Sequence, residues 1–175
     1  MRLVSILILL LALIPPVPIW GLSEKYEATL RQNLWLIIDK KPRYVWGGAE
    51  SEEKGLDCSG YLYLAAKRSG LPVKRVTAVM MEAGLGNWSG KKVTLDDAQE
   101  LDIVWWTWLN TPHRKHGHLG FFLINKRASN LLEVTHSSTS KNGVVIQQLR
   151  GQLLRDISSI KRLTIGDKNE GSNQR

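Results

Sequence analysis

The single cysteine of the chain, Cys58, lies between Asp57 and Ser59, after a glycine-containing loop and before a helical pattern. A free cysteine is among the most buried residue types, so a count of one does not by itself indicate chemistry. The position does, because the first N–H groups of a helix have no intrahelical partner and the helix dipole is positive there. We therefore predict a lowered pKa for Cys58 and a helix start able to bind an oxyanion.

A thiol nucleophile needs a base, and the sequence has four histidines: His113, His116, His118 and His136. His118 begins the strand-like run His-Leu-Gly-Phe-Phe-Leu, and His136 ends the run Leu-Leu-Glu-Val-Thr-His. On neighbouring antiparallel strands, one ring is able to face the thiol while the other holds its tautomer.

His113 and His116 lie in a basic loop and are weaker candidates for the base. The spacing His-x-x-His-x-His also permits a metal site. That loop contains no carboxylate, however, and catalytic zinc usually has three protein ligands and an open position. We therefore expect neither a metal nor a cofactor.

Helical patterns precede strand patterns along the chain. Apolar residues recur at helical spacing over 23–39, with Ser23 as N-cap, and over 58–69, where Gly70 ends the helix. A short helix is expected over 76–83. Strands are expected over 103–107, 118–124, 131–136 and 143–149, with a last one near 160–165. This order predicts an α+β domain with helices packed on an antiparallel sheet, and Trp46, Trp105 and Trp106 are assigned to its core.

The first residues differ from the rest of the 175-residue chain. Arg2 precedes an apolar run from Leu3 to Ile14, which ends in a proline-rich segment and is shorter than the roughly 20 apolar residues of a transmembrane helix. This is the build of a secretory signal peptide. We expect residues 1–21 to be a leader or a short N-terminal anchor, 22–165 one domain and 166–175 a disordered polar tail. The expected location is the periplasm, the cell envelope or the extracellular space.

The formal net charge is +8 and the sequence pI is about 9.7. Such a charge favours a polyanionic neighbourhood, whether nucleic acid, an anionic membrane or an anionic envelope polymer. The basic residues are scattered, without a run typical of a nucleic-acid arm, so we expect no nucleic-acid partner. Anionic envelope polymers are candidate partners, and no stable membrane span is expected once the leader is removed.

Five sequence blocks, in order over roughly residues 26–149, resemble the motifs of the NlpC-type peptidoglycan endopeptidases. The blocks are Tyr44-Val-Trp-Gly-Gly48, Asp57-Cys-Ser-Gly60, Asp102-Ile-Val-Trp-Trp106, His118-Leu-Gly-Phe-Phe122 and Thr135-His136. Two positions depart from the family pattern. Leu101 stands where the family has a glycine before the aspartate, and Leu119 stands where it has valine.

The resemblance implies a papain-like α+β fold with Cys58 as nucleophile, His118 as base and His136 as orienter. It also places Tyr44 at the site, where it helps with the oxyanion. Asp57 and Ser59 lie beside the substrate in this interpretation; in an equally weighted alternative they only cap the helix. Asp102 is expected to be structural and to hold a turn.

The activity implied by the resemblance is cleavage of a peptidoglycan stem-peptide amide by an exported enzyme, typically the bond from D-glutamate to a diamino acid. One alternative is an N-acetylmuramoyl-L-alanine amidase or an acyltransferase on the same scaffold. Another is a non-catalytic wall-binding module. The presence of Cys58, His118 and His136 argues against the wall-binding module, because a degenerate homologue is expected to have lost at least one of them.

Overall fold

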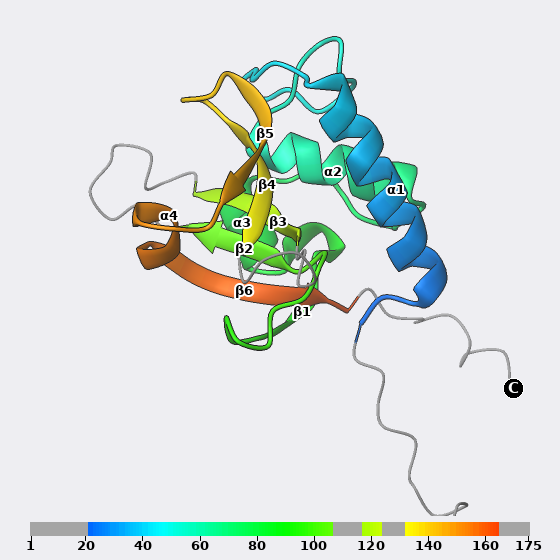
Figure 1. The fold of residues 1–175 in the computed structure, drawn as a ribbon. Coiled ribbons are helices and arrows are strands. Elements are labelled where there is room, and N and C mark those ends of the chain that lie inside the picture. The colour runs from blue at the N-terminus through cyan, green and yellow to red at the C-terminus, as the bar shows by residue number, and fades with distance from the viewer. Residues whose placement is uncertain (1–20, 107–116, 124–131, 165–175) are drawn as a thin grey trace, which may run out of the picture.

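The computed structural model of the chain describes residues 21–106, 117–123 and 132–164 (Figure 1). Residues 1–20 of the predicted leader and the predicted tail lie outside these ranges, as do His113 and His116 of the basic loop. No helix within the described ranges is long and apolar enough to cross a bilayer.

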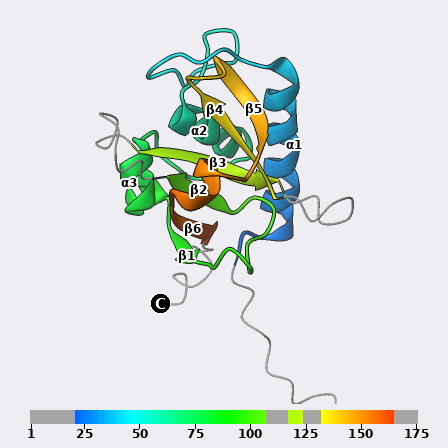
Figure 2. The same ribbon diagram turned by 60° about the vertical axis from the view of Figure 1, so that its left-hand side comes forward.

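A six-stranded sheet with the order β1-β6-β2-β3-β4-β5 forms the centre of the fold (Figures 1 and 2). All neighbouring strands pair antiparallel. The α+β prediction is therefore confirmed. The strands are β1 (Gly90–Lys92), β2 (Ile103–Trp106), β3 (His118–Leu123), β4 (Glu133–Ser138), β5 (Gly143–Gln148) and β6 (Ile157–Leu163).

Two longer helices, α1 (Glu24–Lys40) and α2 (Cys58–Arg68), cover one face of the sheet (Figures 1 and 2). Helix α2 contacts α1 on one side and strands β3 and β4 on the other. The shorter helices are α3 (Ala78–Glu82), the 3-10 helix η2 (Leu85–Asn87) and α4 (Gln152–Arg155). Helix α2 thus carries its first residue, Cys58, to the strands that hold the two candidate histidines.

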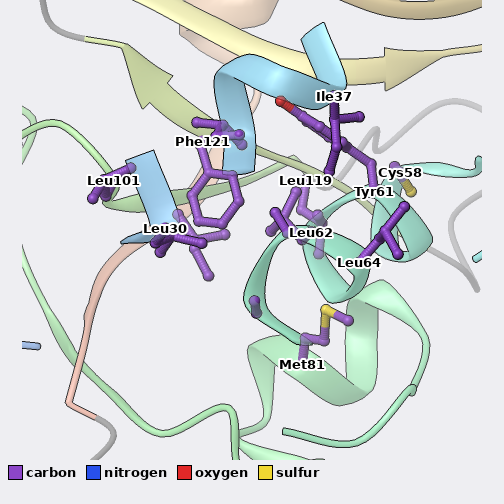
Figure 3. Packing of buried hydrophobic residues seen from close by; sticks show 14 of the residues in the cluster. Leu30, Ile37, Cys58, Tyr61, Leu62, Leu64, Met81, Leu101, Leu119 and Phe121 are labelled. Atoms are coloured by element: carbon purple, nitrogen blue, oxygen red, sulfur yellow. The ribbon is translucent and has the colours of Figure 1, made fainter. Parts of the chain in front are cut away.

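Buried side chains form one apolar cluster on each face of the sheet, because successive strand residues point to opposite faces. Leu119 and Phe121 of β3 join the cluster on the helix side, where Figure 3 shows them with Leu30 of α1 and Leu62 of α2. Phe122 belongs to the cluster on the other face. The alternation along β3 therefore joins the sheet to both clusters.

The short elements β1 and α4 are not predicted by the sequence. Strand β1 has three residues, Gly-Lys-Lys, and exists because it pairs with β6 about seventy positions later in the chain. Strand β4 is displaced from the predicted range 131–136 and begins at Glu133. His136 consequently lies inside β4, where it pairs with Val145 of β5, and not at its end.

The turn before β2 tolerates leucine at the position where the resemblance expects glycine. Leu101 adopts a left-handed φ of 72°, which costs an ordinary side chain about 1–2 kcal/mol. Its side chain is only 6% exposed, so burial offsets this strain. Asp102 holds the turn as predicted, accepting the N–H of Gln99 at 2.8 Å and two bonds from Arg162 at 3.0 Å.

Candidate active site

The capping of α2 determines where Cys58 lies. Asp57 is the N-cap residue, and its Oδ1 accepts the N–H of Gly60 at 2.6 Å and the hydroxyl of Ser59 at 3.1 Å. The backbone N–H of Asp57 donates to the carbonyl of Gly48 at 3.0 Å. A Cβ at Gly60 would lie 1.9 Å from that same carbonyl, so only glycine permits this approach. The loop before α2 is therefore packed directly on the helix start.

Arg75 also binds Asp57 and Ser59 at the start of α2, and the sequence analysis did not identify it. It donates to both carboxylate oxygens of Asp57, at 2.9 and 2.7 Å, and to Ser59 Oγ at 2.7 Å. Gly47 adds a backbone N–H to Asp57 Oδ2 at 3.0 Å. The structure thus shows Asp57 as a cap, one of its two predicted roles. Arg75 belongs to none of the motif blocks and lies between α2 and α3, so no local pattern signals it.

A cavity of about 140 Å³ is lined in part by Cys58. Three of the other predicted site residues, Tyr44, Asp57 and Ser59, line the cavity. Burial, together with the neighbouring Cys58 and Asp57, raises the pKa of Tyr44 to about 12, which keeps its hydroxyl protonated. The cavity is lined by Tyr44, Trp46, Gly47, Asp57, Cys58, Ser59, Arg75, Thr77, Ala78 and Gly117.

Trp46 lines this cavity and does not lie in the core, so the core assignment for this residue is wrong. Its side chain is 65% exposed, whereas Trp105 and Trp106 are buried as predicted. The reason is local. Trp46 precedes Gly47, whose left-handed φ of 77° turns the chain, and the loop sets the indole at the rim of the cavity.

Cys58 is a protonated thiol in this environment, which contradicts the predicted lowering of its pKa. Burial, followed by the negative charge of Asp57, raises the pKa of Cys58 to about 11. The N–H groups of Ser59 and Leu119 and the charge of Arg75 act in the opposite direction but do not compensate. The N–H of Leu119 also places the sulfur at the start of β3, where His118 stands.

The two strand histidines form a hydrogen-bonded pair. His118 Nε2 lies 2.6 Å from His136 Nδ1, and His136 Nε2 lies 2.7 Å from Oε1 of Gln147 in β5. Trp106 packs against both rings, with centroid distances of 5.3 Å to His118 and 5.7 Å to His136. Gly120 leaves room for the pair, since a Cβ there would meet His136 Cβ at 3.0 Å.

Both imidazoles are neutral at pH 7. Burial, reinforced by the neighbouring His136, places the pKa of His118 well below its usual 6.5. Burial also lowers the pKa of His136, although the hydrogen bond to Gln147 opposes this. A neutral imidazole has one nitrogen that accepts a proton, so the pair can act as a base towards a thiol.

We expect the free energy of unfolding to fall as the pH drops from 6.5 towards 5. Both histidines have a folded pKa below their ordinary 6.5, so the unfolded chain takes up protons at a higher pH than the folded chain does. The stability that they contribute is therefore fully present above pH 6.5 and is lost as the pH falls towards their folded pKa values. The limiting slope for one histidine, reached only between its unfolded and folded pKa values, is about 1.4 kcal/mol per pH unit. Urea unfolding across this range measures the loss, and His136→Gln should make the dependence of stability on pH less steep. If the stability of His136→Gln falls as steeply with pH as that of the wild type, His136 does not have a lowered pKa in the folded protein.

The described residues contain no cluster of three His, Cys, Asp or Glu side chains able to hold a metal ion. His113 and His116, which belong to the candidate metal motif, lie outside those residues.

The model of the NlpC/P60 family matches residues 41–161, which include every site residue named above. No curated protein gives a significant match. Solved structures that resemble the chain include a lipoprotein-like NLP/P60 protein from Staphylococcus aureus subsp. aureus Mu50 (15% identity, TM-score 0.60, 82% of this chain and 43% of that one). Others are NlpC2 from Trichomonas vaginalis (21%, 0.57, 77% and 46%) and an NlpC/P60 family protein from Bacillus cereus ATCC 10987 (18%, 0.56, 76% and 40%).

These structural likenesses establish the fold of the described residues. The chain covers less than half of the length of each of the three structures. At 15% to 21% identity, the likenesses do not transfer a substrate or a partner to this chain.

Proposed function

Because the chain belongs to the NlpC/P60 family, whose members are generally peptidoglycan hydrolases, we propose that it cleaves an amide bond in the stem peptide of peptidoglycan. The observation that carries this proposal is the placement of Cys58. Cys58 begins helix α2, lines a cavity of about 140 Å³ and accepts the N–H of Leu119, which follows the base candidate His118 in β3. The bond we propose is the one from D-glutamate to the diamino acid.

In the proposed mechanism, Cys58 gives its proton to His118 while the sulfur attacks the amide carbonyl. A preformed ion pair is not required, because the thiol is protonated and the imidazole is neutral at rest. The oxyanion is stabilised by N–H groups at the start of α2 and by the Tyr44 hydroxyl. His118 then protonates the leaving amine, and a thioester remains on Cys58.

Water completes the reaction. His118, neutral again, takes a proton from a water molecule that attacks the thioester, and the new carboxyl group leaves as the thiol reforms. His136 orients His118 in both steps. Asp57, which also caps α2, and Ser59 line the cavity and lie beside the bound peptide.

We further propose that the protein acts outside the cytoplasm, on the basis of the leader-like residues 1–21. The family is typically cell-wall acting, which agrees with this location. The net charge of +8 favours residence near anionic envelope polymers.

The proposal is tested by incubating the full chain with purified muropeptides in water enriched in ¹⁸O and identifying the products by mass spectrometry. We expect a fragment that ends in D-glutamate and carries one ¹⁸O in its new carboxyl group. Cleavage between the lactyl group and L-alanine would support the amidase alternative instead. A transfer product without ¹⁸O would support the acyltransferase. Absence of any product would contradict all three and leave the wall-binding module.

A further inference from the structure

We propose that Gln147 is a positioning residue of this site: its side-chain carbonyl selects the tautomers of His136 and, through it, of His118, so that His118 keeps Nδ1 unprotonated. The inference rests on the proposed function only for its consequence in catalysis, because the tautomers are a property of the folded protein. Gln147 belongs to none of the motif blocks found in the sequence.

The pairing of β4 with β5 brings Gln147 to His136. His136 lies opposite Val145 and Val134 lies opposite Gln147, so Gln147 and His136 are diagonal neighbours on one face of the two strands. The amide oxygen reaches His136 Nε2 at 2.7 Å. Strand β5 ends the sheet in this order, and Gln147 itself is half-buried.

The chain of hydrogen bonds allows only one proton arrangement when the Gln147 oxygen faces His136. A carbonyl oxygen can only accept, so His136 Nε2 must carry the hydrogen. A neutral imidazole carries a single N–H, so His136 Nδ1 is bare and accepts the hydrogen of His118 Nε2 across 2.6 Å. His118 Nδ1 then carries no hydrogen, and it is the nitrogen at which His118 can accept a further proton.

The opposite arrangement shows why the acceptor matters. With a donor in place of the Gln147 oxygen, the hydrogen on each ring moves to the other nitrogen, and His118 Nδ1 carries a hydrogen. That tautomer cannot accept a proton at Nδ1. The ring faces of the pair are packed against Trp106, which restricts ring flips and leaves the hydrogen bonds to set the tautomer.

The test compares Gln147→Met, which keeps the length of the side chain but has no acceptor, with Gln147→Glu, which keeps one. Gln148→Met is the matched control. Gln148 is the next residue on β5, is also half-buried and pairs with Glu133 on the opposite face. Two readouts are used for each protein: imidazole ¹⁵N chemical shifts, which report the tautomers directly, and the steady-state kinetics of muropeptide cleavage.

In the wild type we expect single tautomers, with the hydrogen on Nε2 of both rings. Gln147→Met should show mixed tautomers and a kcat about 10–100-fold lower with an unchanged KM, the range of losses seen when the hydrogen-bond partner of a metal-bound histidine is removed. Gln147→Glu should retain the wild-type tautomers and most of the kcat. Gln148→Met should match the wild type in both readouts.

The proposal is overturned if Gln147→Met keeps the wild-type tautomers, or if Gln148→Met loses as much kcat as Gln147→Met does. A wild-type His136 with its hydrogen on Nδ1 also overturns it, and that measurement needs no variant to fold. If the tautomers behave as expected but no muropeptide is cleaved, the proposed function fails while this inference stands.

Discussion

Replacement of Cys58 by alanine is expected to lower the rate of muropeptide cleavage by about 10⁴-fold or more. Removing the nucleophile of a catalytic triad leaves only the contributions of substrate binding and of oxyanion stabilisation. The fold should survive, because the exchange removes one sulfur atom from a site at the edge of the core, where Cys58 is 9% exposed. We expect a loss of about 1 kcal/mol in the free energy of unfolding.

Cleavage rates and urea unfolding of the same preparations measure these two effects. Cys58→Ser is the closest control in shape, since it replaces the thiol with a hydroxyl that ionises far less readily. It should be inactive as well if the chemistry depends on sulfur. A Cys58→Ala protein that is folded and retains a tenth of the wild-type rate would exclude Cys58 as the nucleophile.

Replacement of Arg75 by methionine is expected to destabilise the fold by about 2–3 kcal/mol. It leaves the buried Asp57 carboxylate without its cation, and breaking a fully buried pair costs about 3–5 kcal/mol. We expect less than this for Arg75→Met because the Arg75 side chain is 27% exposed to solvent, which weakens the ion pair. The pKa of Cys58 should rise further, since the charge of Arg75 lowers it, and thiol alkylation by iodoacetamide at pH 8 should become slower.

Asp57→Asn is the matched exchange, because asparagine still caps a helix but carries no charge. It should lower the pKa of Cys58, since the charge of Asp57 raises it. The double variant Asp57→Asn/Arg75→Met has no buried carboxylate left without a cation. We therefore expect it to be more stable than Arg75→Met alone. Urea unfolding of the four proteins gives the coupling energy. If the two single exchanges change the free energy of unfolding additively, the ion pair between Asp57 and Arg75 does not contribute to stability.

The long elements and the central candidates followed from local sequence patterns. Helix α2 begins at Cys58 because Asp57 is a good N-cap and apolar residues recur at helical spacing after it, and both signals lie within a dozen positions. Strands β2 and β3 are runs of mostly apolar residues, and every residue in them is buried. The start of such a run made His118 a candidate, and the resemblance to the NlpC-type endopeptidases then implied that it is the base.

Features that depend on contacts between distant segments could not be predicted from local sequence patterns. Strand β1 is too short to have a period, and it is defined by hydrogen bonds to β6. Gln147 acquires its role from the register between β4 and β5, and Arg75 acquires its role from the packing of a loop on the start of α2. Nothing near either residue in the sequence distinguishes it from other glutamines or arginines.

The ionisation of Cys58 separates the two kinds of information most clearly. The sequence by itself determined that the only thiol stands at a helix start, preceded by a capping aspartate and followed by two strand-borne histidines. Local electrostatics then predicted a lowered pKa. Only the tertiary structure decided that the sulfur is buried between α2 and the start of β3, where the loss of hydration outweighs the helix N–H groups and raises the pKa to about 11. Desolvation is a property of everything packed around the sulfur, and so it cannot be deduced from its neighbours in the chain.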